Sequence, residues 1–441
     1  MDIVIDCGTS FLKAALIDEK TGEIVRNEIV ETSKYTFADS FPKITGTVKA
    51  VKEIMDGFLM EDIGFTVAIA TEMHGFLLTD KDGNPLCDYV SWKDEWAEWQ
   101  KGGATYLEEL KKIVPEEEVK HTGMALKSGI ASTNLYVLLD KEKTLVERKD
   151  IYFYTLGDYL IRVLTGKQPF IHPTNAAASG LYDLKTRMWS EKLINVLGFE
   201  GIHFPKIAEK EIVTAEYNGK EVSFCEAIGD QQAALLGSGL NAEKMLSFNM
   251  GTGSQVSVLN RKLVLADEFQ TRPFFDGFYL NTIPHVPCGR ALHVIFDFFE
   301  QFLESYSGKK VDEERLWKFL WDQEAQAEQT DLEIDMSFFV NSVTSDTRGS
   351  ITNIGEKNFY AADVMRAVVE RMAQNYYKVT KILLQKEEKV EKIVFSGGVA
   401  EKNEILREKI ASCFSGSSVQ VARNETFVGL WRYINKSLER G

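Results

Sequence analysis

The sequence predicts an α/β protein built from two domains. Short strand-like segments alternate with longer helix-like segments, and a strand, Gly-Thr turn, strand pattern occurs near residue 8 and again near residue 252. At 441 residues, 44% hydrophobic and 27% charged, the chain is long enough for two separate cores. We expect an N-terminal domain over residues 1–228 and a C-terminal domain over residues 229–441.

Charge and composition exclude several classes of function. The net charge of −15 argues against nucleic-acid or anionic-membrane partners, which need concentrated Lys and Arg. No uncharged apolar run approaches the roughly 18 residues of a membrane span. Met1 is followed by Asp2 and a strand-like segment rather than a basic leader, so we expect a cytoplasmic protein. The five cysteines contain no C-x-x-C pair, so neither a disulfide framework nor a zinc site is expected.

The first hairpin is predicted from the buried strand 3–5, a small polar turn and the returning strand 11–18. Glycine in the turn lets the backbone approach a ligand, and the hydroxyls and amides beside it suit phosphate oxygens. A carboxylate at the strand end suits Mg²⁺, and a lysine on the second strand suits phosphate. The candidate residues are Asp6, Gly8, Thr9, Ser10 and Lys13. The alternative is a plain hairpin turn.

A second hairpin of the same type is predicted from the strands 245–248 and 255–259. Its turn offers Gly251, Thr252 and Gly253 to a phosphate chain. Further on, the strand 393–395 leads through paired glycines into a helix, a turn against which a flat base or ribose can lie. The candidate nucleotide contacts of this turn are Gly397, Gly398 and Asn403.

Asp230 is the candidate catalytic base. It follows Gly229 at the end of a strand-like segment, near the midpoint of the chain, and the small apolar run 233–240 after it predicts a helix. A carboxylate in that position can reach a hydroxyl held between two domains. The alternative is an ordinary turn or helix cap. Gln231, next in the chain, is a candidate sugar contact.

Candidate sugar contacts also occur in the first half. Met73 and His74 follow the buried strand 66–70, where an imidazole can bind a sugar hydroxyl, although a structural histidine is as common. Trp92 and Asp94 combine an apolar ring face with a carboxylate, a pairing that suits a sugar pocket. The alternative for this pair is a core tryptophan beside a helix-capping aspartate.

The order of these segments resembles the FGGY family of carbohydrate kinases along nearly the whole chain. That resemblance implies two ribonuclease H-like domains of the actin, hexokinase and heat-shock-protein type around a central cleft. It also implies that the first hairpin binds phosphate and Mg²⁺, and that the second hairpin and the Gly-Gly turn bind ATP. Asp230 would be the catalytic base, and Asp6 and Asp230 would both lie at the metal. The matching segments are DCGTSFLKAALID from Asp6, EMHGFLLTDKDGNPL from Glu72, DYLIRVLTG from Asp158, TNAAASGLYDLKTRMW from Thr174, GDQQAALLG from Gly229, NMGTGSQVSVL from Asn249 and FSGGVAEKN from Phe395.

The expected activity is transfer of the γ-phosphate of MgATP to a hydroxyl of a small ketose, by a phosphotransferase with an alcohol acceptor. The run from Met73 to Gly75 is more similar to the pentulose and heptulose branches than to the glycerol branch, which favours xylulose or sedoheptulose. Homodimers are common among similar kinases. The alternatives are a non-catalytic sugar- or nucleotide-binding regulator, or an actin- or chaperone-like ATPase, on the same fold.

Overall fold

A computed structural model describes residues 1–441 except 33–39, 60–63, 328, 345, 386–388 and 440–441. The chain forms two compact units. Unit 1 comprises Met1–Gly237, Arg261–Tyr279 and Asn424–Gly441, and unit 2 comprises Ser238–Asn260 and Leu280–Arg423. Within the described ranges, no helix is long and apolar enough to cross a membrane.

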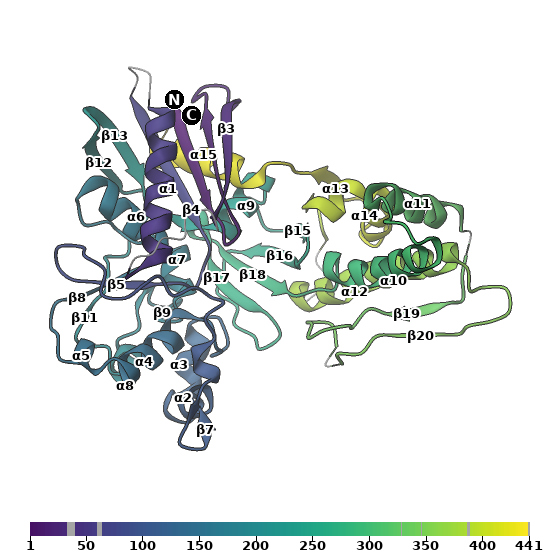
Figure 1. The fold of residues 1–441 in the computed structure, drawn as a ribbon, viewed down its shortest axis with the longest axis horizontal. Helices are drawn as coiled ribbons and strands as arrows, with labels where there is room; N and C mark the ends of the chain where they lie inside the picture. The colour runs from purple at the N-terminus through teal and green to yellow at the C-terminus, as the bar shows by residue number, and fades with distance from the viewer. Residues whose placement is uncertain (33–39, 60–63, 328, 345, 386–388, 440–441) are drawn as a thin grey trace. The chain divides into compact units, whose positions relative to one another are not determined.

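Unit 1 is built on a mixed sheet with the strand order β12-β13-β4-β1-β2-β3, and β14 pairs with the end of β4 (Figure 1). The first two strands form the predicted hairpin, in which Asp6 lies opposite Lys13, whereas β1 and β4 run parallel. The strands are β1 Asp2–Cys7, β2 Phe11–Ile17, β3 Ile24–Glu31, β4 Phe65–Thr71, β12 Ile212–Tyr217, β13 Lys220–Cys225 and β14 Ile228–Gly229.

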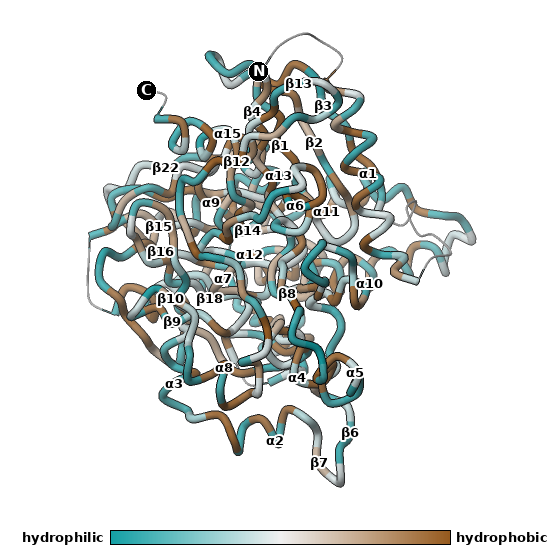
Figure 2. The backbone as a smooth tube through the Cα atoms, turned by 90° about the vertical axis from the view of Figure 1, so that its left-hand side faces the viewer, coloured by the Kyte–Doolittle hydropathy of each residue, from teal (hydrophilic) through white to brown (hydrophobic). Residues whose placement is uncertain are grey.

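Helices cover both faces of this sheet. Alternate side chains of a strand point to opposite faces, so Ile3 and Ile5 join a core with α1 (Pro42–Phe58) and α6 (Leu156–Thr165). The helix α15 (Glu425–Ser437) packs against β1 and β4. Figure 2 shows hydrophobic segments along β1 and β4, as expected for strands buried on both faces.

The helix that begins at Asp230, α9 (Asp230–Ser238), lies very close to α15. A Cβ atom on Gly237 would overlap the carbonyl oxygen of Glu425, and one on Gly429 would overlap the carbonyl oxygen of Ala233. Arg432 adds a 2.8 Å hydrogen bond from Nη1 to the carbonyl oxygen of Leu236. Two glycines therefore set the distance at which α9 packs.

The rest of unit 1 is a set of short elements. Helix α6 ends at Gly166, whose φ of +67° suits glycine. The elements are β5 Leu77–Thr79, the 3₁₀ turn Trp96–Glu98, β6 Gln100–Lys101, β7 Ala104–Thr105, α2 Tyr106–Ile113, α3 Glu116–His121, α4 Ala131–Lys141, α5 Lys143–Val146, β8 Ile151–Tyr154, α7 Pro173–Ala178, β9 Tyr182–Asp183, β10 Met188–Trp189, α8 Glu191–Leu197, β11 Ile202–His203, β17 Gln270–Pro273 and the 3₁₀ turn Phe275–Gly277.

Unit 2 has its own sheet, in which strands follow the order β18-β16-β15-β21-β22. The second predicted hairpin is confirmed as β15 and β16, which pair antiparallel. The elements are β15 Met245–Met250, β16 Ser254–Asn260, β18 Tyr279–Pro284, α10 Gly289–Ser307, α11 Glu313–Gln326, β19 Glu333–Asp335, β20 Ser350–Thr352, α12 Ala361–Leu384, β21 Lys392–Ser396, α13 Gly398–Lys402, α14 Glu404–Ser412 and β22 Ser418–Val421.

The buried carboxyl of Asp158, in the first turn of α6, should make the stability of the fold depend on pH. Oδ2 accepts hydrogen bonds from Thr155, whereas the buried Oδ1 has no partner among the described residues. Burial raises the pKa of Asp158 to about 7, against the hydrogen bonds from Thr155. A carboxyl whose folded pKa lies above its unfolded value stabilises the fold at low pH and loses that contribution as pH rises through the folded pKa.

We therefore expect the free energy of unfolding of Asp158→Asn to rise relative to that of the natural chain as pH increases from about 4 to about 7. The expected change in this difference is on the order of 3 kcal/mol. The amide cannot ionise and keeps one oxygen for Thr155. Urea unfolding at pH 5 and pH 8 measures the difference, and a pH-independent difference would contradict the expectation.

Candidate active site

Asp230 lies at the first residue of α9, directly after β14. One carboxylate oxygen, Oδ1, accepts a 2.7 Å hydrogen bond from the backbone NH of Gln231. Gly229 is required beside it, since a Cβ there would come within 2.6 Å of the Gln232 amide oxygen and 3.0 Å of the Met73 sulfur. Burial, and then the charge of Asp6, raise the pKa of Asp230 to about 7, a value suited to accepting a proton near neutral pH.

The first hairpin supplies the neighbouring carboxylate. Burial raises the pKa of Asp6 to about 6, and the positive charge of Lys13, across the hairpin, opposes the shift. The turn is tight because the NH of Gly8 donates to the carbonyl oxygen of Phe11 at 3.1 Å. Ser10 is exposed at the tip. The carboxylate of Asp6 raises the pKa of Asp230 by its charge, and the two carboxylates beside a Gly-Thr turn form a donor set that suits Mg²⁺ together with phosphate oxygens.

A chain of side-chain hydrogen bonds joins the hairpin tip to the end of β4 and to the loop after β5. The Thr9 hydroxyl donates to the carboxylate of Glu72, and the Trp92 indole NH donates to the same hydroxyl at 3.2 Å. Trp92 is 45% exposed, so the predicted alternative of a core tryptophan does not describe it. Glu72 is buried, and its charge contributes to raising the pKa of Asp230.

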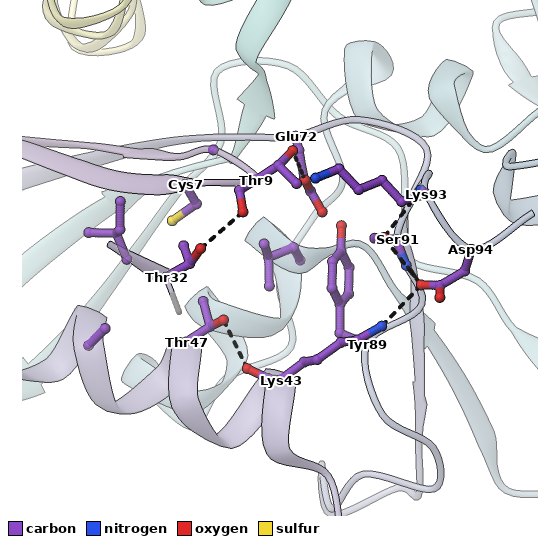
Figure 3. A pocket seen from close by; sticks show the side chains of 14 residues that line it. Cys7, Thr9, Thr32, Lys43, Thr47, Glu72, Tyr89, Ser91, Lys93 and Asp94 are labelled. Atoms are coloured by element: carbon purple, nitrogen blue, oxygen red, sulfur yellow. Dashed lines mark hydrogen bonds and ion pairs between the residues drawn. The ribbon is translucent and has the colours of Figure 1, made fainter. Parts of the chain in front are cut away.

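Thr9 and Glu72 line a cavity of about 350 Å³ in unit 1 (Figure 3). Its polar wall carries the loop residues Ser91, Lys93 and Asp94, and its apolar wall comes from α1, β2 and α6. The lining residues are Cys7, Gly8, Thr9, Leu12, Thr32, Lys43, Thr47, Ala50, Glu72, Tyr89, Ser91, Lys93, Asp94 and Leu156. Of the residues predicted for the hairpin and the sugar site, Gly8, Thr9 and Asp94 line this cavity. The others are not among its lining residues: Asp6, Ser10, Lys13, Met73, His74, Trp92, Asp230 and Gln231.

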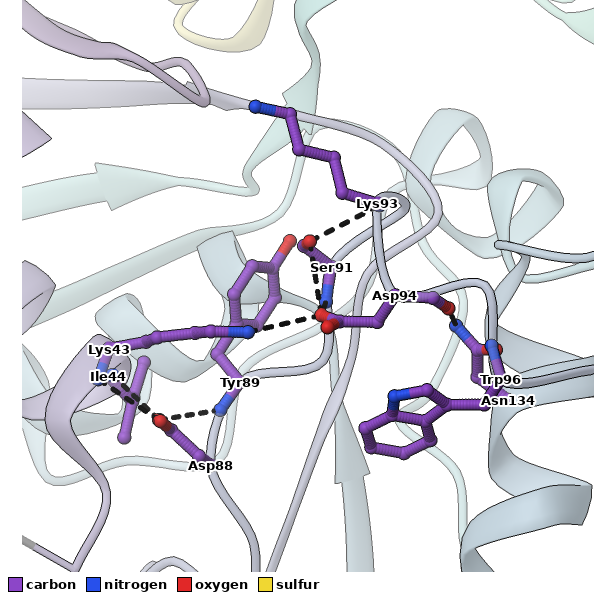
Figure 4. A network of polar contacts seen from close by, with 9 residues as sticks. All are labelled: Lys43, Ile44, Asp88, Tyr89, Ser91, Lys93, Asp94, Trp96 and Asn134. Atoms are coloured by element: carbon purple, nitrogen blue, oxygen red, sulfur yellow. Dashed lines mark hydrogen bonds and ion pairs between the residues drawn. The ribbon is translucent and has the colours of Figure 1, made fainter. Parts of the chain in front are cut away.

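The carboxylate of Asp94 organises its own loop (Figure 4). Its Oδ2 accepts from the NH of Ser91 at 2.8 Å and forms an ion pair with Lys43 at 3.1 Å. Asn134, on α4, holds the same loop from the other side by donating to the Asp94 carbonyl and accepting from the NH of Trp96. The loop that carries Trp92 is therefore fixed at both ends.

His74 occupies a strained backbone position, with φ of +73°, a conformation that clusters at functional sites. Its Nδ1 lies 2.7 Å from the carbonyl oxygen of Ala178, so this nitrogen carries the proton and Nε2 is an acceptor. Arg272 on β17 points its Nη2 at that Nε2 from 3.4 Å. Burial, followed by the charges of Arg272 and Lys127, holds the pKa of His74 well below its usual value, so the ring is neutral.

In unit 2 the second hairpin and the Gly-Gly turn meet. Gly397 has φ of +88°, and a Cβ on it would lie 2.8 Å from the carbonyl of Met250 and 3.0 Å from the NH of Gly251. The first two NH groups of α10 donate to the carbonyl oxygens of Gly251 and Thr252. These contacts bring the candidate phosphate and adenosine segments side by side. Asn403 caps α14 through a 2.7 Å hydrogen bond from the NH of Leu406.

Family models match both halves of the chain: the N-terminal domain of the FGGY family of carbohydrate kinases over residues 1–237 and the C-terminal domain over residues 246–430. The chain belongs to the FGGY family of carbohydrate kinases. A sedoheptulokinase from Mus musculus is 21% identical over 98% of this chain and 98% of its own length.

Solved FGGY structures share the fold. A ligand-bound xylulose kinase from Lactobacillus acidophilus superposes with a TM-score of 0.81 at 18% identity, covering all of this chain and 90% of its own. A glycerol kinase with ADP from Plasmodium falciparum gives 0.79 at 18% identity, with the same coverage. The predicted α/β class with two domains is confirmed, and the chain is a carbohydrate kinase.

Two residues of this FGGY kinase site escape sequence reasoning. Glu72 begins one of the family-matching segments, but nothing in the local sequence distinguishes it from an ordinary residue at the end of a strand. Only its hydrogen bond with Thr9 shows that it belongs to the site. Arg272 lies in a segment without any motif, and nearly 200 residues separate it from His74. A contact of this kind arises from the packing of α7 against β17 and has no local signal in the sequence.

Proposed function

We propose that this FGGY kinase transfers the γ-phosphate of ATP to a hydroxyl of a small polyhydroxy sugar, with Asp230 as the general base. The observation that carries the proposal is the placement of Asp230 at the start of α9, with a pKa raised to about 7 and a second carboxylate, Asp6, in its field. A base with that pKa is partly ionised at neutral pH and accepts a proton readily.

In the proposed mechanism, Asp230 accepts the proton of the attacking hydroxyl. The hairpin turns at Gly8 and Thr9, and at Gly251 to Gly253, hold phosphate oxygens through backbone NH groups, and Lys13 adds a positive charge. Gly397, Gly398 and Asn403 shape the place of the adenosine. Phosphoryl transfer needs little covalent chemistry from the protein, so positioning of the two substrates supplies most of the rate.

Asp6 and Asp230 are the residues that would hold Mg²⁺. When bound, the ion neutralises charge on the transferring phosphoryl group. Both carboxyls have raised pKa values, chiefly because of burial, and the charge of Asp6 adds to the shift of Asp230. A cation between them would relieve that repulsion.

The sugar contacts proposed are Met73, His74, Trp92, Asp94 and Gln231. The resemblance of the segment around His74 to the pentulose and heptulose branches favours a ketose framework. The similarity of the chain to a sedoheptulokinase and a xylulose kinase supports the same choice. The alternatives, a regulator or an ATPase on the same fold, have no observation in their favour.

A coupled ADP-release assay over ketoses, aldoses, polyols and sugar acids tests the proposal. ADP release that depends on an acceptor is the expected result. Release that does not depend on an acceptor would indicate an ATPase, and no release with any acceptor would overturn the kinase. The homodimer, the cytoplasmic location and the domain boundary between residues 228 and 229 stay predictions.

Gly397→Ala is expected to weaken ATP binding by about tenfold or more, because Cβ at a φ of +88° is strained and meets the backbone of Met250. The matched control is Gly416→Ala, which carries the same strain at φ of +81° with no atom within 4 Å and no place in the proposed site. Calorimetric titration with ATP measures the affinities. Equal losses in both variants would contradict a role of the Gly-Gly turn in nucleotide binding.

A further inference from the structure

Arg272 carries a buried positive charge with unused hydrogen-bonding capacity. Arg272 is buried, with only 6% of its surface exposed. Nη2 donates to the Gln270 side chain at 2.8 Å, and Nη1 faces the weakly accepting sulfur of Met73 at 3.8 Å. Nε is buried and has no partner among the described residues. The side chains in contact with this guanidinium are thus neutral, although it would bind a carboxylate well.

A second cation lies close by. Lys127, in the loop before α4, is near enough for the charge of Arg272 to lower its pKa, after burial, which is the larger cause. The next residue, Ser128, has a buried hydroxyl without a partner in the described part of the chain. Arg272, Lys127 and the hydroxyl of Ser128 are all donors.

No ion pair within 4 Å joins Arg272 or Lys127 to a carboxylate in the residues that the structure describes. The carboxylates whose charges reach them are Asp230 for Arg272 and Glu95 for Lys127, both beyond that distance. Burying a cation without a carboxylate in direct contact is costly, and such an arrangement is retained where a ligand supplies that contact.

We propose that the acceptor of this kinase is a sugar acid, an aldonate or its keto acid, whose carboxylate binds to Arg272, with the charge of Lys127 adding to the attraction. The inference rests on the proposed kinase function and narrows its acceptor. A keto acid keeps the ketose framework, and its carboxylate would lie at the end of the substrate held by Met73 and His74.

The position of Arg272 favours the acceptor over the transferring phosphate. Its contacts are Met73, His74 and Gln270, whereas no hydrogen bond joins it to the described residues of the hairpin 6–11. A guanidinium that stabilised the phosphoryl group would serve every acceptor alike. One that binds a carboxylate serves only acids, and this difference separates the two roles.

The test compares matched acceptors: D-xylonate with xylitol, D-gluconate with D-glucitol, and 2-keto-D-gluconate with D-fructose. The expected result is a kcat/KM at least about 30-fold higher for one or more acids than for the neutral partner, because a buried, hydrogen-bonded charge pair is lost in the neutral compound. Arg272→Gln should lower kcat/KM for the acid far more than for its neutral partner, so that the preference disappears. Arg148→Gln, at an exposed ion pair with Asp150, is the matched control and should keep the preference.

Binding without ATP separates this inference from the kinase proposal. Calorimetry should detect the preferred acid with the natural chain and Arg148→Gln, should detect none with Arg272→Gln, and should show weaker binding with Lys127→Met. Binding without phosphorylation would overturn the kinase and keep the anion site. Three outcomes would overturn the sugar-acid assignment. The first is a preference for neutral acceptors, and the second is a preference for D-xylulose 5-phosphate over every acid. The third is an equal loss of kcat/KM for acids and for neutral compounds in Arg272→Gln.

Discussion

Asp230→Asn is expected to lower kcat by about 10³-fold while ATP still binds, because an amide of the same shape cannot accept the proton of the acceptor hydroxyl. The hydrogen bond from the NH of Gln231 can be kept by the amide oxygen, so α9 should start at the same residue. The measurement is acceptor-dependent ADP release at saturating substrates, with ATP affinity determined separately by calorimetry.

The control for this experiment is Asp150→Asn, which removes a carboxylate from an exposed ion pair with Arg148 and should change kcat by less than about twofold. An Asp230→Asn enzyme with near-normal turnover would refute the assignment of the base. Loss of ATP binding together with turnover would show instead that Asp230 acts chiefly in holding the nucleotide and its metal.

Gly429→Ala is expected to destabilise unit 1 by about 3 kcal/mol or more. The new Cβ would overlap the carbonyl oxygen of Ala233, and backbone on two packed helices cannot move as a flexible side chain can. Because α9 begins at Asp230, a displacement of α9 also moves the base, so turnover should fall even where the chain stays folded.

Thermal unfolding and ADP release measured on the same samples test both parts of this expectation. Gly201→Ala is the matched control, since no atom lies within 4 Å of its added Cβ and its backbone is not left-handed. Unchanged melting temperature in Gly429→Ala would show that the two helices can separate without cost, and would contradict the close packing as the device that positions α9.

Much of the fold follows from local pattern. Alternation and apolar runs predict both hairpins, and the structure confirms them as β1 with β2 and β15 with β16. Gly166 ends α6, since helices commonly end at a left-handed residue and glycine adopts that conformation most easily. The sequence also singles out Asp230 and His74, since each follows a buried strand beside a glycine.

Other features depend on residues distant in the sequence. Asp94 is a predicted sugar contact, yet its carboxylate accepts a local hydrogen bond from Ser91 and pairs with Lys43, a contact that follows from the placement of α1. Glu72 reaches Thr9 only because β1 and β4 are parallel neighbours. Local sequence cannot predict such pairs, because they depend on which strands and helices pack together.

The sequence by itself determined the family, the two phosphate-type hairpins and the candidate base, because these depend on short segments whose residue types and spacing are informative alone. Only the tertiary structure decided that Asp230 shares its field with Asp6 and Glu72, that two glycines set the position of α9, and that Arg272 lies buried beside His74 with no ion pair within 4 Å among the described residues. Burial and proximity shift a pKa or leave a charge unpaired, and both arise only when distant segments come together.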